Sequence, residues 1–138
     1  MLAAIRLGQS ALATEYLAGL RYRGRFVALV EEVLDDHDAL LLPTIPVVAP
    51  QRASQTVRLG DGSEMGVQVA LTALPGPFNC SGSPVVSVPV GLVDGLPVGA
   101  SLVGRIGGDH ELLRVAAVVE DAVRFSGQGG ALASRLAR

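Results

Sequence analysis

The stretch VVSVPVGLVDGLPVGASLVG, residues 85–104, decides how the middle of this 138-residue chain folds. Two valine-rich segments, 85–90 and 98–103, flank a linker at 91–97 that contains Gly, Asp and Pro. Valine favours strands, and a short Gly-bearing linker is typical of antiparallel neighbours. The stretch therefore predicts a β-hairpin. Pro89 has no amide hydrogen, so it predicts an irregular or edge position in the first strand.

A helix is predicted directly after the hairpin, near 109–124. Asp109 is a suitable N-cap residue, and Glu111 adds negative charge to the first turn. Apolar residues recur at helical spacing behind it: Leu112, Leu113, Ala116, Val119 and Val123. The Gly-rich residues 126–138 are expected to form a flexible tail.

A long amphipathic helix is predicted before the hairpin, from Ser10 to about Asp36. Its apolar residues share one helical face and are called the α-stripe below: Leu12, Tyr16, Leu20, Val27, Val30 and Leu34. The short apolar run 39–42 follows and ends at Pro43. Its length and composition predict an interior strand buried on both faces.

The remaining segments are interpreted mainly as loops. Three prolines within 43–50 exclude both a helix and a central strand there. Residues 51–66 have the polar, Gly-bearing composition of a surface loop, and 67–74 fit either a strand or a helical turn. Residues 75–84 combine Pro, Gly, Asn and Ser, which predicts a turn-rich segment.

Composition limits the classes of function. The length fits a single domain, predicted over 1–125. The net charge of -2 gives no field that attracts nucleic acid or anionic lipid. All 11 basic residues are Arg, so no Lys can serve as a Schiff base, phosphate ligand or general base. Only 17% of residues are charged and 49% are hydrophobic, which predicts apolar surface that a partner, a dimer or further chain covers.

Cysteine usage and hydropathy bear on the compartment. The single cysteine, Cys80, cannot form an internal disulfide, and no secretory leader pattern is visible. Charged residues or Gly and Pro interrupt every long apolar segment. We therefore expect a cytoplasmic protein with neither a membrane nor a nucleic-acid partner.

Isolated reactive residues do not assemble into a motif. His110 and Glu111 begin a helical zinc motif, but Arg114 stands where its second histidine belongs. Neither phosphate-binding nor dinucleotide-binding glycine patterns occur, and we expect no cofactor. Cys80 with His37 or His110 is a conceivable thiol nucleophile and base, although burial as a small apolar residue is the favoured interpretation. Turn or strand-surface roles are favoured for the serines, and a solvated or ion-paired face for Arg21, Arg23 and Arg25.

The order of several segments resembles the C-terminal portion of an amidase signature enzyme. The segments are DALLLPTIP at 38–46, NCSGSPVVSVPVG at 79–91, GLPVG at 95–99 and LVGR at 102–105, with matches continuing to Glu120. The resemblance implies an α/β fold, a partial amidase-type arrangement with a mixed β-sheet flanked by helices. It also implies hydrolysis of a carboxylic amide by a Ser, a second Ser on a cis peptide bond and a Lys base.

The resemblance places the catalytic Ser and Lys residues in a half of the family fold that this sequence does not match. It implies instead a substrate-binding role, lining the acyl pocket, for Thr44, Ile45, Pro46, Thr72, Asn79 and Cys80. Members that use tRNA-bound substrates and glutamine carry an acid near the position of Thr72, which weakens a glutamine-using interpretation. Many members also carry Gln where Ser101 stands.

Three functional hypotheses follow. The first is a C-terminal amidase segment, inactive alone, that supplies scaffold and pocket wall to an N-terminal catalytic half. The second is a non-catalytic, amidase-derived interaction or oligomerisation module that uses its apolar surface. The third and weakest is a cysteine hydrolase acting through Cys80.

Overall fold

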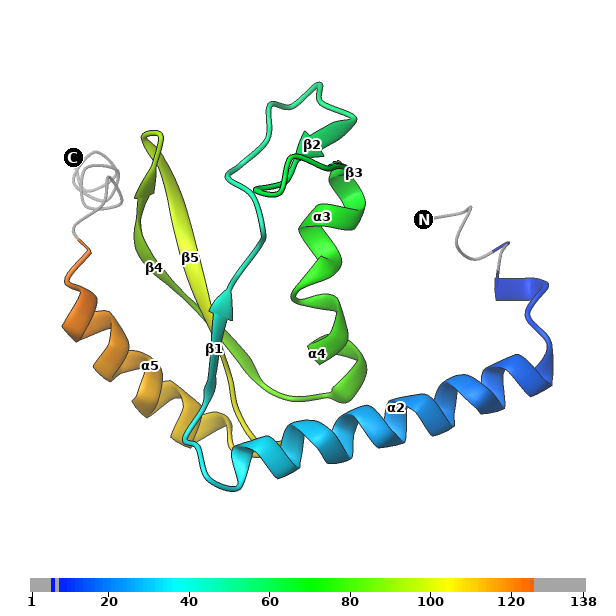
Figure 1. Ribbon diagram of the computed structural model, residues 1–138. Coiled ribbons are helices and arrows are strands. Elements are labelled where there is room, and N and C mark those ends of the chain that lie inside the picture. Colours follow the sequence, from blue (N-terminus) through cyan, green and yellow to red (C-terminus); the bar gives the residue numbers. More distant parts are fainter. Residues whose placement is uncertain (1–5, 7, 126–138) are drawn as a thin grey trace, which may run out of the picture.

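A computed structural model describes residue 6 and residues 8–125 (Figure 1). The predicted tail at 126–138 lies outside the described residues. The α/β class predicted from the sequence is confirmed. The elements, in chain order, are α2 (Ala13–Leu34), β1 (Leu40–Pro43), β2 (Thr56–Arg58), β3 (Glu64–Gly66), α3 (Val67–Ala73), α4 (Gly76–Ser81), β4 (Val85–Val93), β5 (Leu96–Val103) and α5 (Asp109–Val123).

The predicted hairpin is formed by β4 and β5, which pair antiparallel along their lengths. Both strands are longer than the valine runs suggested, because the turn contains only Asp94 and Gly95. These two residues adopt positive φ angles of 52° and 78°, the conformation that Asp-Gly supplies in tight hairpins. The turn therefore fixes where the pairing of the two strands starts.

A three-stranded antiparallel sheet results, in the order β1-β5-β4. The mixed β-sheet expected from the resemblance is not seen among the described residues, because every pairing between their strands is antiparallel. The prediction that 39–42 form an interior strand was wrong, because β1 lies at the edge of the described sheet and pairs only with β5. Leu41, in its middle, is 65% exposed.

The main core lies between this sheet and α5, which runs along one face (Figure 1). Val88 and Leu102 from the hairpin pack there with Leu112 and Ala116 from α5, and all four are buried. A Cβ at Gly104 would lie 3.2 Å from the Leu112 Cβ, so the strand end can approach the helix because this residue is glycine.

Helix α5 confirms the predicted periodicity but not the predicted cap. Gly108 is the N-cap residue, and Asp109 is the first residue of the helix. Asp109 and Glu111 still place negative charge in the first turn, where the helix dipole favours it.

Two segments interpreted as irregular are ordered. The predicted surface loop at 51–66 contains the β2–β3 hairpin. For 67–74, where a strand and a helical turn were both open, the helical alternative is confirmed by α3. The turn-rich segment 75–84 contains the helix α4, which has Pro in its first turn and ends at Gly82 with a φ of 84°. Proline is tolerated in a first helical turn and glycine ends a helix, so the same residues that indicated turns also fit a short helix.

The long helix α2 confirms the predicted 10–36 helix with slightly closer bounds. Its C-terminal half packs on the rest of the molecule, and Val30 and Leu34 are buried. Phe26 contacts Phe78 of α4, with ring centroids 6.2 Å apart. The N-terminal half extends beyond α3 and α4 (Figure 1). Within the described residues, none of the helices combines the length and apolar character that crossing a membrane requires.

Candidate functional site

The sheet carries a cluster of three hydrogen-bonded hydroxyl groups, defined here as the hydroxyl cluster: Thr44, Ser87 and Ser101. The Thr44 Oγ1 lies 2.7 Å from the Ser87 Oγ and accepts a hydrogen bond of 3.0 Å from the Ser101 Oγ. The Thr44 amide also donates to the Gly99 carbonyl at 3.0 Å. Thr44 belongs to the proline-rich segment 43–50, defined here as the proline loop, and anchors this loop to both strands of the hairpin.

A β-bulge creates the register on which this cluster depends. Pro89 pairs with Gly99 and Gly91 with Val98, so Val90 is an extra residue without a partner. A regular hairpin from the same turn would place Ser87 opposite Leu102, a core residue. The bulge shifts the pairing by one residue, so that Ser87 lies opposite Ser101. The predicted irregularity at Pro89 is confirmed.

Gly99 leaves the space that the hydroxyl cluster occupies. A Cβ built there would lie 2.9 Å from the Thr44 Oγ1 and 3.1 Å from the Ser87 Oγ. Any larger residue would have to displace at least one of the two hydroxyl groups. The cluster is therefore a built feature of the hairpin, positioned by the bulge, the register and this glycine.

The other predicted pocket residues lie on the two short helices. The Thr72 hydroxyl donates to backbone carbonyls of its own helix, Gln68 at 2.9 Å and Val69 at 3.2 Å. Asn79 and Cys80 lie on α4, and both are exposed. The favoured burial of Cys80 was therefore wrong.

Cys80 contacts α2 through its backbone carbonyl rather than through its thiol. Its carbonyl accepts a 2.5 Å hydrogen bond from the Arg23 Nε of α2. No histidine of the described residues is hydrogen-bonded to its thiol, and the His37 Nδ1 lies 2.8 Å from the Val33 carbonyl oxygen. Arg23 thus joins two helices, which accounts for one member of the arginine cluster.

The structure divides the six predicted residues into two groups. Thr44, Ile45 and Pro46 follow β1 on the sheet side, whereas Thr72, Asn79 and Cys80 lie on α3 and α4 (Figure 1). None of the six lines the hollow that surrounds Arg105. Their shared role in one pocket thus stays a prediction.

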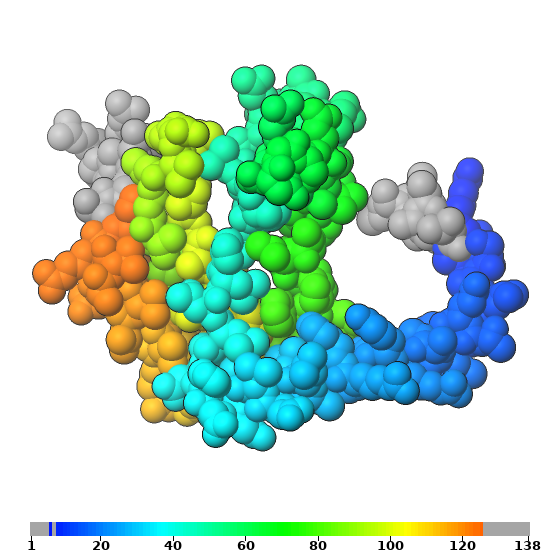
Figure 2. All heavy atoms as spheres, in the orientation of Figure 1, coloured from blue at the N-terminus to red at the C-terminus, as the bar shows by residue number. Residues whose placement is uncertain are grey.

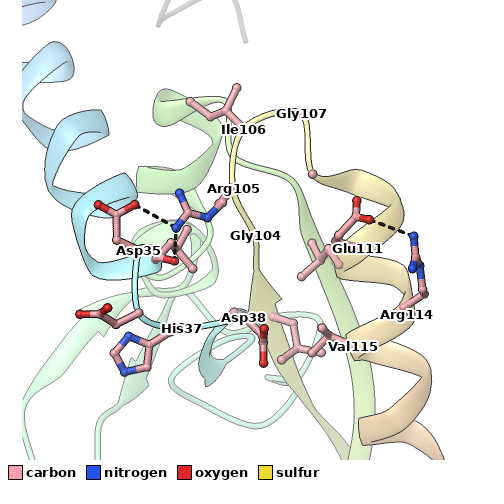
Figure 3. Close-up of a pocket in the computed structure, with 16 residues that line it drawn as sticks. Asp35, His37, Asp38, Gly104, Arg105, Ile106, Gly107, Glu111, Arg114 and Val115 are labelled. Atoms are coloured by element: carbon pink, nitrogen blue, oxygen red, sulfur yellow. Dashed lines mark hydrogen bonds and ion pairs between the residues drawn. The ribbon is translucent and has the colours of Figure 1, made fainter.

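That hollow, about 1060 Å³, lies between the α2–β1 connection and the β5–α5 loop (Figure 3). Its polar residues include Asp35, Asp38, Arg105, Glu111 and Arg114. Figure 3 shows the two arginines, each held by a carboxylate from the hollow's own wall. In the part of the chain that the structure describes, no group of three His, Cys, Asp or Glu residues could hold a metal ion.

Arg105 connects the C-terminal end of α2 to the β5–α5 loop. Its Nη2 donates to the Leu34 carbonyl and, at 2.9 Å, to the Asp35 Oδ1. Its Nη1 lies 3.9 Å from a Glu31 carboxylate oxygen, and the other oxygen of Glu31 accepts a bond from the Ile106 amide at 3.0 Å. The last turn of α2 contains no basic residue, so Arg105 supplies the positive charge that a helix C-terminus favours.

Comparison with known proteins assigns the family. The sequence profile described as Amidase matches residues 1–113. This chain belongs to the amidase family. A fatty acid amide hydrolase of Oryza sativa subsp. indica is 34% identical over 110 residues, which are 79% of this chain and 18% of that protein. A glutamyl-tRNA(Gln) amidotransferase subunit of Cenarchaeum symbiosum is 36% identical over 113 residues, 80% of this chain and 22% of that protein.

The fold gives the same assignment. A crystal structure of an amidase superposes with a TM-score of 0.81 at 30% identity and covers 87% of this chain but 27% of the amidase chain. The chain thus spans about a fifth of the length of these curated relatives. The described arrangement is a part of the amidase fold.

The hydroxyl cluster and the Arg105 contacts were not predicted from the sequence. The serines were assigned to turns or strand surface, and Arg105 entered only as part of a resembling segment. Pro89 was the one signal for the register, because a bulge inside a two-residue-turn hairpin changes which residues face each other. No sequence signal joined Arg105 to Leu34, since 71 residues separate them.

Proposed function

We propose that this amidase segment forms part of the acyl pocket and the scaffold of an enzyme that hydrolyses carboxylic amides, and that it is inactive alone. The observation that carries the proposal is an amidase-family segment with no Lys among its 138 residues. The Lys base of the family mechanism therefore has to come from outside these residues. We propose a cytoplasmic location for the assembled enzyme.

The pocket-wall role rests on the anchoring of the proline loop. The Thr44 side chain and amide are both held by the hairpin, so the loop leaves the sheet in a fixed direction. Ile45 and Pro46 follow directly and are half-buried and exposed, respectively. An apolar pair on an anchored loop is suited to contact the acyl part of a substrate. Thr72, Asn79 and Cys80 would form the other wall.

The substrate is proposed to be an amide without a free amino group beside the scissile bond. Thr72 offers a neutral hydroxyl, which already donates to its own helix. It cannot pair with an ammonium group as a carboxylate does. A glutamine-using activity therefore finds no acidic partner at this position.

The test combines the purified chain with the catalytic portion of an amidase from this family. We expect no turnover of an aryl or acyl amide by either part and measurable turnover by the mixture. An Ile45→Ala variant is expected to change the relative kcat/KM for short and long acyl groups, whereas Glu120→Ala, on the exposed surface of α5, leaves that ratio unchanged. Amide hydrolysis by the purified chain alone would refute the proposal.

Exposed apolar residues favour a second candidate, a non-catalytic interaction module. Leu12, Tyr16 and Leu41 are each more than half exposed. Two results together would favour this candidate over the first. The chain would form a stable complex with a partner that lacks the catalytic Ser and Lys residues, and its mixture with the catalytic portion of an amidase would show no turnover.

The cysteine-hydrolase hypothesis has its own test. Cys80 is exposed, so a thiol reagent can reach it. Rapid labelling at neutral pH would support a reactive thiolate, whereas labelling at the rate of an ordinary exposed thiol would reject this hypothesis.

A further inference from the structure

The α-stripe of α2 is buried along one half and exposed along the other. Val30 and Leu34, in the C-terminal half, are buried. Leu12, Tyr16 and Leu20 continue the same face at four-residue spacing, yet they are 62%, 66% and 43% exposed. One helix face thus starts in solvent and ends in a packed interior.

The exposed half lies beyond the point where α4 covers the helix. Phe78 of α4 contacts Phe26, and the Cys80 carbonyl of α4 accepts a hydrogen bond from Arg23. We take these two contacts as the N-terminal limit of the part of α2 that α4 covers. Figure 2 shows open space between the atoms of α3 and α4, in green, and those of the N-terminal half of α2, in blue. The outer edge of β1, which pairs only with β5 among the described residues, is a second incomplete surface of the chain.

We infer that the exposed half of the α-stripe is the docking surface for the catalytic portion of an amidase, which packs beside α4 on the same face of α2. This inference rests on the proposed function and names the partner surface. Continuity carries it, because the exposed residues extend an interface that this chain already makes with α4. The amidase crystal structure contains almost four times the aligned length, so the family fold has further chain available to pack on that face.

A second copy of this chain is a weaker occupant. A two-fold helix pair would bury Leu12, Tyr16 and Leu20 against themselves, but it would leave the edge of β1 and the missing Lys unexplained. The catalytic portion of the fold would explain all three features: the exposed half of the α-stripe, the uncovered edge of β1 and the missing Lys.

The test compares two substitutions on the same helix. Leu20→Asp places a charge in the exposed half of the stripe, and Leu29→Asp is the matched control on another face, where Leu29 is 57% exposed. Each full chain is titrated against the separately produced catalytic portion, with affinity and amide turnover both recorded. We expect Leu20→Asp to weaken binding at least about tenfold and Leu29→Asp to change it less than about twofold.

The outcomes separate the docking surface from the proposed function. In the first outcome, the wild-type chain binds the catalytic portion and gives turnover, and the two variants weaken this binding equally. That outcome would overturn the docking surface and keep the function. Binding without turnover, weakened only by Leu20→Asp, would keep the surface and reject the function. A wild-type chain that binds no catalytic portion, or that forms a dimer disrupted by Leu20→Asp, would overturn the inference. Circular dichroism of both variants checks that α2 is retained.

Discussion

Replacing Arg105 by Ala should destabilise the chain more than any other single arginine change in the described hollow. The variant removes the donor to the Leu34 carbonyl and the pairing with Asp35 and Glu31. It also leaves two carboxylates beside the C-terminal end of α2, where the helix dipole disfavours negative charge.

The expected magnitude follows from the exposure of each partner. The bond to the part-buried Leu34 carbonyl involves a charged donor and is worth about 1.5 kcal/mol. The Arg105 side chain is 43% exposed, so each carboxylate pair is screened and adds at most about 0.5 kcal/mol. The free energy of unfolding should therefore fall by about 2 kcal/mol. Arg105→Lys should recover less than half, because a single ammonium group cannot reproduce the forked contacts.

Urea denaturation followed by far-ultraviolet circular dichroism measures this difference. Arg114→Ala is the control, because Arg114 pairs with Glu111 across one exposed helical turn and should contribute about 0.3 kcal/mol. Equal losses for Arg105→Ala and Arg114→Ala would refute the reasoning. A loss for Arg105→Ala that vanishes in 1 M salt would assign the effect to screened charge interactions rather than to the hydrogen bond with the Leu34 carbonyl.

Three further predictions concern the sheet and the small hairpin. Gly99→Ala should lower the free energy of unfolding by about 1–3 kcal/mol, whereas Gly91→Ala, where a Cβ meets nothing within 4 Å, should lower it less in the same urea assay. Thr44→Val and Ser101→Ala should together lose less than the sum of their single losses, as a double-mutant cycle will measure, because the first change already deprives the second hydroxyl of its partner. Ser63 donates hydrogen bonds to the Asp61 carboxylate through its hydroxyl and its amide, and both bonds lower the pKa of Asp61. The stabilisation of the folded state by these bonds is therefore present above the ordinary Asp pKa and is lost as pH falls through the lowered pKa. An NMR titration of Asp61 with a midpoint at or above the ordinary value would contradict this.

Periodicity and valine clustering predicted the long elements well. The hairpin, α2 and α5 each carry a pattern that is repeated over many residues, so local deviations do not hide it. Helix α4 was missed because Pro75 and Pro77 fit turns and a helical first turn equally well. The β2–β3 hairpin has strands of three residues each, too short for alternation to be recognised.

The site was less predictable than the fold, because its geometry depends on pairs that are distant in sequence. Thr44 and Ser101 meet only after β1 pairs with β5, and Ser87 lies opposite Ser101 only because of a one-residue bulge in β4. The exposure of Cys80 was not predictable from its residue type, since a small apolar side chain is usually buried. Composition did predict the excess apolar surface, which the exposed half of α2 and Leu41 confirm.

The anchored loop and the uncovered helix have different consequences in an assembled enzyme. The hydroxyl cluster and Gly99 fix the start of the proline loop through contacts made entirely within this chain. In the proposed enzyme, the wall that the proline loop contributes would therefore be preformed before a partner binds, whereas the reactive Lys would arrive with the partner. Acyl selectivity should then follow this chain, and the rate of the chemical step should follow the catalytic portion. Pairing this chain with catalytic portions from two different amidases tests that division, because selectivity that changes with the catalytic portion would place the pocket wall there instead.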